Sequence, residues 1–210
     1  MTITAADATL DGDLDRPADP RGVVLFAHGS GSSRHSPRNR RVAEALVAAG
    51  AATLLMDLLT AEEDRVDQRT REFRFDTGWL GRRLTAAVDW LADDPLTRDL
   101  PVVTFGASTG AAAALIAAAE RPDRVCGVIS RGGRPDLAAD HLARVRALVL
   151  LIVGGRDPIV LDLNRVAASR LTAPVDLVEV PRATHLFEEP GTLDAVIGHA
   201  VTALSRWLPG

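Results

Sequence analysis

The sequence contains no lysine, so its 24 strongly basic residues are all arginines. This absence excludes a phosphate-binding P-loop, a Schiff-base lysine and a Ser-Lys catalytic dyad, because each needs a lysine amine. Tyrosine is also absent, so no phenol can serve as a general acid or as a hydrogen-bond donor to an oxyanion. The chemistry of this chain must come from other side chains.

Cysteine occurs once, at Cys126, so the chain cannot form an intramolecular disulfide, which is typical of proteins from a reducing compartment. The acidic N-terminus lacks the apolar segment of a signal peptide, and no apolar run approaches the roughly 20 residues that a membrane span needs. The formal net charge is −4, which gives no general attraction to nucleic acid or to anionic membranes. We therefore expect a cytoplasmic protein that acts on a small molecule, with no nucleic-acid or membrane partner.

The length of 210 residues suits one core of ordinary size, so we expect a single domain over residues 1–210. Short apolar runs alternate with helical patterns along the chain. The expected strands are 23–29, 52–59, 101–108, 125–130, 147–155 and 175–180. The expected helices are 38–49, 79–91, 109–120, 134–145, 161–171 and 192–208. Strands that are apolar throughout belong to parallel sheets covered on both faces, so the pattern predicts an α/β fold: a doubly wound, mostly parallel sheet with helices on both faces and no lid domain.

Two further segments carry weaker expectations. The segment "ATLDGDLD" contains Asp11-Gly12, a pair typical of a hairpin turn, and predicts an antiparallel hairpin at the N-terminus. The charged stretch Thr60–Asp76 predicts a surface excursion between a strand and a helix.

The stretch "FGASTGAAAAL" places Ser108 between Gly106 and Gly110, directly after an apolar strand and before an alanine-rich helix. A nucleophile elbow needs this context, because a strained strand-to-helix turn lifts the serine hydroxyl above the sheet edge. A tight turn without catalytic function would explain the glycines, but not the serine between them. The context favours Ser108 as a nucleophile.

A nucleophilic serine needs a histidine base and an acid that orients it, in the order serine, acid, histidine for this kind of fold. Asp157 follows the strand "ALVLLIVGG", and His185 follows the strand "VDLVEV". Both residues are thus expected at carboxyl ends of parallel strands, where ligands bind in open α/β sheets. Asp136 is a weaker candidate for the acid, and His28 could line the site. The remaining candidates are expected in helices or polar loops: Asp162, His35, His141 and His199.

An oxyanion hole needs two backbone N–H groups aimed at the developing charge. One should come from Thr109, the residue after the nucleophile, and the other from Ser30 in the loop "HGSGSS". The alternative for this loop is a phosphate cradle, which the missing lysine disfavours.

The segments "LFAHGSGSS", "FGASTGAAAAL", "LLIVGGRDP" and "ATHLFEEPG" together resemble the α/β-hydrolase superfamily, in particular its small, lidless, dienelactone-hydrolase-like branch. The resemblance implies Ser108 as nucleophile, Asp157 as acid and His185 as base, with Ser30 and Thr109 as oxyanion donors. Dienelactone hydrolases use cysteine as the nucleophile, whereas serine stands here.

These patterns predict a serine hydrolase that cleaves a carboxylic ester, lactone or thioester through an acyl-enzyme, without metal or organic cofactor. Two alternatives stay open: a binding or regulatory module without turnover, and a peptidase or amidase. Arg34 and Arg131 lie in loops that follow two of the expected strands, so they are candidates for binding an anionic substrate group. The alternative is that they only solvate the surface. The sequence does not determine the oligomeric state.

Overall fold

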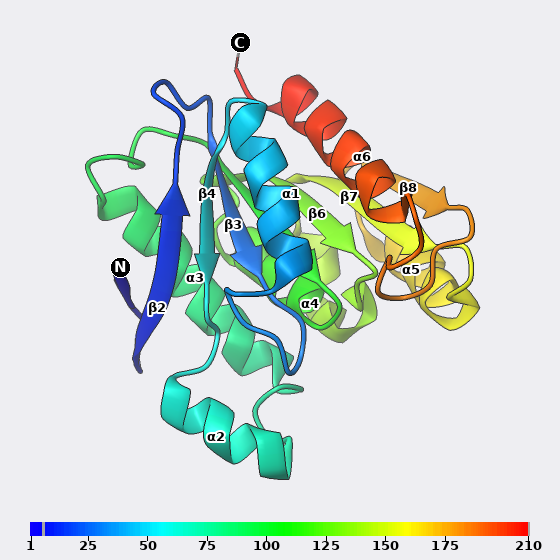
Figure 1. Cartoon of the computed structure of the whole chain (residues 1–210), viewed down its shortest axis with the longest axis horizontal. Helices are drawn as coiled ribbons and strands as arrows, with labels where there is room; N and C mark the ends of the chain where they lie inside the picture. The colour runs from blue at the N-terminus through cyan, green and yellow to red at the C-terminus, as the bar shows by residue number, and fades with distance from the viewer. Residues whose placement is uncertain (6, 210) are drawn as a thin grey trace.

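The structure is a computed structural model that describes residues 1–5 and 7–209. It contains an eight-stranded sheet in the order β1-β2-β4-β3-β5-β6-β7-β8 (Figure 1). The strands are β1 (Thr2–Thr4), β2 (Thr9–Asp15), β3 (Val23–Ala27), β4 (Ala52–Met56), β5 (Val102–Ala107), β6 (Val125–Arg131), β7 (Leu148–Gly154) and β8 (Val175–Val180). The helices are α1 (Pro37–Ala48), α2 (Ala61–Thr70), α3 (Thr77–Asp93), α4 (Gly110–Glu120), η1 (Pro135–Arg144), α5 (Pro158–Arg170) and α6 (Thr192–Trp207).

Strands β3 to β8 pair in parallel, while β1 and β2 pair antiparallel at one edge. Every residue of β3, β4 and β5 is buried, which explains why these strands are apolar except for Thr53 and Thr104. The doubly wound, mostly parallel α/β sheet that the sequence predicts is confirmed. All the carboxyl ends of the parallel strands lie at one edge of the sheet.

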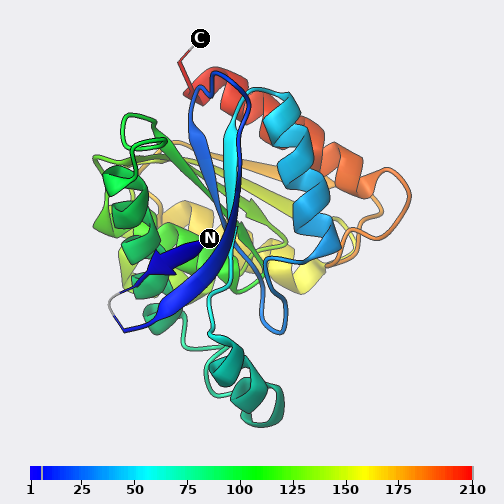
Figure 2. The same cartoon turned by 60° about the vertical axis from the view of Figure 1, so that its left-hand side comes forward.

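Helices cover both faces of the sheet (Figure 2). Side chains of α1 and α6 pack on one face, and those of α3, α4, η1 and α5 pack on the other. Every residue of α4 from Gly110 to Ala119 is buried, since the small alanine side chains let this helix lie close to its neighbours. The close approach of α3 to α4 depends on Gly81, where a Cβ would lie 2.6 Å from the Ile116 side chain. Ser108 lies in the turn just before this helix.

The N-terminal hairpin exists, but the expected turn at Asp11-Gly12 is wrong. Both residues lie inside β2, and Gly12 pairs with Met56 of β4. A Cβ on Gly12 would lie 2.8 Å from the Ile3 side chain and 3.1 Å from that of Leu54. The glycine lets these side chains pack over the backbone of a strand, and it does not mark a chain reversal.

The stretch Thr60–Asp76 contains α2, which extends beyond the carboxyl ends of β3 and β4 (Figure 1). Thr60 and Glu63 form a capping box at its start, in which each side chain accepts from the other's backbone N–H. Asp67 is the buried residue of this helix, so α2 is held mainly through polar contacts. Downstream, η1 is a 3₁₀ segment interrupted at Ala139, which has a φ of 37°. Within the described ranges, no helix is both long and apolar enough to cross a membrane.

Candidate active site

Ser108 lies in the sharp turn between β5 and α4 and has a φ of 51°, in the left-handed region that residues with a Cβ rarely adopt. Two glycines make the turn feasible. A Cβ on Gly106 would lie 2.3 Å from the Ala111 Cα, and one on Gly110 would lie 2.2 Å from the Ala27 carbonyl oxygen. The glycines around the serine therefore let a strained turn exist at the carboxyl edge of the sheet.

His185 connects the serine to a carboxylate. Its Nε2 is 3.2 Å from the Ser108 Oγ, and its Nδ1 is 2.7 Å from the Asp157 Oδ2. The carboxylate cannot donate when ionised, so Nδ1 carries the hydrogen and Nε2 is left as the acceptor for the serine hydroxyl. The His185 side chain is 38% exposed and the Asp157 side chain 16%, so the imidazole faces solvent while the carboxylate is shielded. The structure thus brings together the three residues proposed as a triad.

The turn after β7 frees the Asp157 carboxylate for this contact. Asp157 stands at the N-cap position of α5, and Pro158 occupies the first helical position. Proline has no N–H that needs a cap, and the Asp157 side chain makes no capping hydrogen bond. The other candidate acid, Asp136, is bound at 2.8 and 2.7 Å by the Arg134 guanidinium. Asp157 is therefore the carboxylate that orients His185.

His28 is buried and holds the loop after β3 in place. Its Nε2 accepts the Leu58 N–H at 3.0 Å, which leaves the hydrogen on Nδ1, 2.9 Å from the Gly29 carbonyl oxygen. Burial lowers the pKa of His28, so the ring is neutral. Its role is to anchor the loop "HGSGSS", and not to act as a base.

The two residues predicted as oxyanion donors lie in contact with each other. The backbone N–H of Ser30 donates to the Thr109 Oγ1 at 3.0 Å. In the part of the chain that the structure describes, the Thr109 N–H and hydroxyl hydrogen have no hydrogen-bond acceptor. The contact joins the loop after β3 to the start of α4. The sequence reasoning considered only backbone N–H groups and missed this hydroxyl, because nothing in the motif shows that the loop reaches it.

The two candidate arginines differ in their surroundings. The Arg34 guanidinium pairs with Asp57 and lies 3.7 Å from both Asp11 and Asp13, so carboxylates already compensate its charge. Arg131 is 8% exposed, and among the described residues no carboxylate pairs with it. Only Arg131 therefore remains free to bind an anion.

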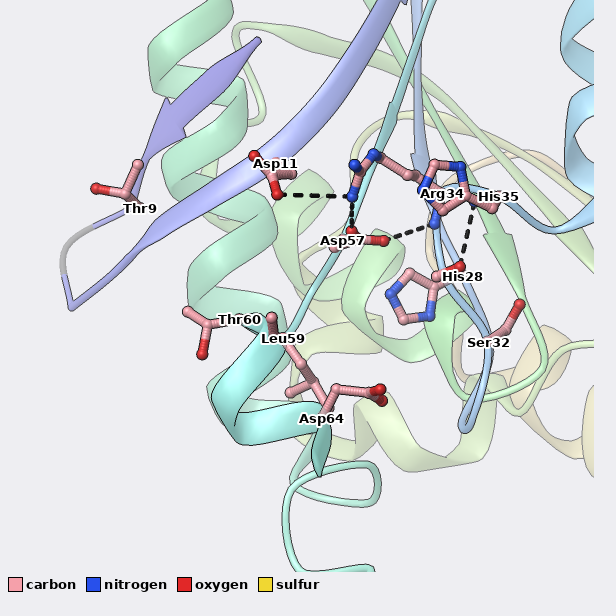
Figure 3. A pocket seen from close by; sticks show the side chains of 12 residues that line it. Thr9, Asp11, His28, Ser32, Arg34, His35, Asp57, Leu59, Thr60 and Asp64 are labelled. Atoms are coloured by element: carbon pink, nitrogen blue, oxygen red, sulfur yellow. Dashed lines mark hydrogen bonds and ion pairs between the residues drawn. The ribbon is translucent and has the colours of Figure 1, made fainter. Parts of the chain in front are cut away.

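Arg34 lines a cavity of about 310 Å³ between the hairpin strand β2, the loop after β3 and the start of α2 (Figure 3). Asp11, Asp57, Asp64 and His35 also line this cavity, and Asp11 and Asp57 face Arg34 across it. No group of three or more His, Cys, Asp or Glu residues suited to a metal ion occurs in residues 1–5 and 7–209. Ser108 is not among the residues that line this cavity.

The single cysteine, Cys126, and the histidines His141 and His199 lie away from the triad. Cys126 is near the start of β6, at the opposite end of the sheet, and its thiol donates to the Val102 carbonyl oxygen at 3.4 Å. Burial raises the pKa of the Cys126 thiol, which disfavours the reactive thiolate. His141 contacts the Ala138 carbonyl oxygen within η1, and His199 is exposed on α6.

The family model described as "Alpha/beta hydrolase domain" matches residues 20–208 of the chain. The chain belongs to this family. A dienelactone hydrolase from Anabaena variabilis is 54% identical, with a TM-score of 0.97, and the match covers 100% of this chain and 97% of that one. A serine hydrolase without a lid from Xanthomonas campestris is 24% identical, with a TM-score of 0.79 over 100% of this chain and 94% of that one, and shows the same fold. The predicted resemblance to lidless, dienelactone-hydrolase-like α/β-hydrolases is confirmed.

Two curated relatives from Mycobacterium tuberculosis strains are 56% identical over 196 residues, which is 93% of this chain. Each is named a "Putative phosphoribosyl transferase". The match covers 43% of those proteins, so this α/β-hydrolase chain spans less than half of their length. Their named activity is therefore not carried over to this chain.

Proposed function

We propose that the α/β-hydrolase chain is a serine hydrolase that cleaves a carboxylic ester, lactone or thioester. The observation that carries this proposal is the position of His185, within hydrogen-bond reach of both the Ser108 Oγ and the Asp157 carboxylate. The three residues come from the turns after β5, β7 and β8. A serine, a histidine and a carboxylate in a hydrogen-bonded series form the arrangement that acyl transfer uses.

The proposed reaction starts with attack of the Ser108 Oγ on the acyl carbon, while the His185 Nε2 takes the hydroxyl proton. Asp157 holds the imidazole through its Nδ1–H and stabilises the imidazolium that forms. His185 then passes the proton to the leaving alcohol or thiol as its bond to the acyl carbon breaks. A water molecule, deprotonated by His185, releases the acid from the acyl-enzyme and restores the serine.

The oxyanion of each tetrahedral intermediate would be held by the Thr109 N–H, which has no acceptor among the described residues, and by the Ser30 N–H. The Ser30 N–H donates to the Thr109 hydroxyl in the structure. The substrate oxyanion must therefore either share this N–H with the hydroxyl or replace the hydroxyl as its acceptor. Strain at Ser108 and a fixed imidazole keep the nucleophile in position before substrate arrives. No step of this proposed reaction requires a cofactor. We also propose that the enzyme works in the cytoplasm.

The test is to measure turnover of p-nitrophenyl esters, a lactone, a thioester and an anilide by wild type and Ser108→Ala. We expect turnover of at least one oxygen or sulfur ester, and a loss of kcat on the order of 10⁴ to 10⁶ in the variant. Ser205→Ala, an exposed serine on α6, is the matched control and should keep the wild-type rate. Turnover of the anilide alone would instead assign an amidase, and no turnover of any compound would favour a binding module. Near-wild-type rates in Ser108→Ala would rule out the mechanism.

A further inference from the structure

Arg131 is a buried cation that has no counterion among the residues that the structure describes. The residue is 8% exposed, its Nη1 is fully buried without a hydrogen-bond partner, and no described carboxylate pairs with it. The other deeply buried arginine, Arg83, shows how the fold usually compensates such a charge: its guanidinium binds Asp7, Glu63 and the Leu58 carbonyl oxygen. A buried charge that lacks such partners is destabilising unless something else binds it.

Further positive charge lies near Arg131. Burial of the guanidinium, together with the nearby charge of Arg38, lowers the pKa of Arg131 to about 10, so it remains charged at neutral pH. Arg38 belongs to the first turn of α1, which has no acidic residue, although a helix N-terminus favours negative charge. Arg38 pairs with Glu188, whose carboxylate lies 3.0 Å from the Arg38 Nη1, and Arg40 in the same turn pairs with Asp13 at 2.8 Å. Among the described residues, these carboxylates pair with Arg38 and Arg40, and none pairs with Arg131.

This positive region borders the candidate active site. Arg131 is the last residue of β6 and pairs in register with Ala107, the residue before Ser108. The Ser108 N–H donates to the Arg131 carbonyl oxygen at 3.2 Å. The next residue, Gly132, lies so close to His185 that a Cβ on it would be 3.0 Å from the His185 carbonyl oxygen. The Arg131 backbone is thus hydrogen-bonded to the nucleophile, and the residue that follows it lies against His185.

Strand alternation gives the direction of its side chain. Ile129, two residues earlier in β6, packs on the face covered by α1 and α6, so Arg131 points to the same face. The Arg131 guanidinium accordingly lies on the side of the first turn of α1, which Arg38 and Glu188 link to the loop that carries His185. The charged groups of Arg131, Arg38 and Glu188 thus lie on the α1 side of the sheet, near its carboxyl edge.

We propose that Arg131, supported by Arg38 and the first turn of α1, binds an anionic group of the substrate, either a carboxylate or a phosphate. The assignment of this group to a substrate rests on the proposed serine hydrolase function, whereas anion binding itself does not. Guanidinium groups suit both anions, because they can donate two parallel hydrogen bonds.

Discrimination between substrates tests the proposal. Matched p-nitrophenyl esters would have acyl chains of equal length that end in a methyl, carboxylate or phosphate group, with uncatalysed hydrolysis subtracted. Wild type should show a higher kcat/KM for one of the charged esters, and Arg131→Gln should lower this preference at least about tenfold while leaving the neutral ester unchanged. Arg131→Lys should keep part of the preference. Arg34→Gln, whose arginine is already paired with carboxylates, is the matched control and should keep it in full. Equal effects of Arg131→Gln on all three esters, or no effect, would overturn the proposal.

Two measurements separate this result from failure of the hydrolase mechanism. Calorimetric titration of Ser108→Ala with glutarate and with inorganic phosphate needs no turnover, and at least one should bind; adding Arg131→Gln should abolish that binding. Undiminished binding in the double variant would overturn the proposal. The Tm of Arg131→Gln should equal or exceed that of wild type, because a buried unpaired charge is removed. A fall in Tm of several degrees would instead give Arg131 a structural role and overturn the proposal.

Discussion

The backbone N–H of Ser30 donates to the Thr109 side-chain hydroxyl at 3.0 Å, and this bond joins the two segments that we propose as the oxyanion hole. Before substrate binds, the hydroxyl satisfies the Ser30 N–H and holds the loop after β3 against the start of α4. In the described part of the chain, the hydroxyl hydrogen itself has no acceptor. We therefore propose that the Thr109 side chain is a positioning group for the oxyanion hole, in addition to the backbone N–H that the motif assigns to it.

Thr109→Val removes the hydroxyl and keeps the side-chain shape. It should lower kcat by at least about tenfold, and by no more than the roughly 10²–10³ that loss of one oxyanion donor causes, with little change in KM. Thr109→Ser should keep most of the wild-type kcat, because it retains the hydroxyl. Steady-state kinetics on a neutral ester is the measurement. Wild-type kcat in the valine variant would show that the hydroxyl plays no part.

Substitution to asparagine distinguishes Asp157 from Asp136 as the acid that orients His185. Asp157→Asn keeps the size of the side chain but favours the wrong imidazole tautomer in His185, so kcat should fall by about 10⁴. Asp136→Asn removes only an ion pair with Arg134 and should leave kcat near wild type. The two variants can be compared by kcat and by melting temperature. A larger loss of kcat in Asp136→Asn would reverse the assignment of the acid.

Asp67 should make the free energy of unfolding depend on pH in the acidic range. Burial alone would raise the pKa of its carboxyl, but hydrogen bonds from the Arg74 backbone and side chain and from the Phe73 N–H lower it below its usual value. A carboxyl with a lowered pKa stabilises the fold above its unfolded pKa of about 3.9, and this contribution is lost as pH falls through the lower folded value. Asp67→Asn should therefore reduce the free energy of unfolding by about 1–3 kcal/mol at pH 7.

The difference between wild type and Asp67→Asn should shrink as the pH is lowered below about 4. Denaturant unfolding at a series of pH values measures it. Asp64→Asn is a suitable control, because the Asp64 carboxylate accepts one exposed hydrogen bond from Gln68 on the same helix. A difference that stays constant over the series would contradict the pKa assignment for Asp67.

The arrangement of the sheet was predictable because strands buried on both faces are apolar along nearly their whole length, and this pattern is visible in the sequence. β7 consists of apolar residues and ends in a glycine, and α4 consists almost wholly of alanine between its ends, so both are evident without a structure. The Asp11-Gly12 pair misled the prediction, because a glycine required by close packing looks the same in sequence as one required by a turn. α2 was missed because it has no apolar stripe, although Thr60 and Glu63 at the spacing of a capping box were a usable signal.

The positions of Ser108, Asp157 and His185 were predictable because each follows a strand of one parallel sheet, and such strands end at one edge. The surroundings of the arginines were not. Arg34 is compensated by aspartates from β2 and from the end of β4, so its partners depend on tertiary pairing between distant segments. What distinguishes Arg131 is that no carboxylate among the described residues pairs with its guanidinium, and no sequence pattern reveals this.

The most direct test of the central claim is to locate the residue that a fluorophosphonate probe modifies. Such probes react with a serine only when a neighbouring base activates it, so the adduct reports the nucleophile without knowledge of the substrate. The protein would be labelled at neutral pH, digested, and analysed by mass spectrometry, with Ser108→Ala and Asp157→Asn treated in parallel. The account predicts one adduct per chain on Ser108, no adduct in Ser108→Ala, and much slower labelling in Asp157→Asn. An adduct on another serine, or an unlabelled wild-type protein, would contradict it.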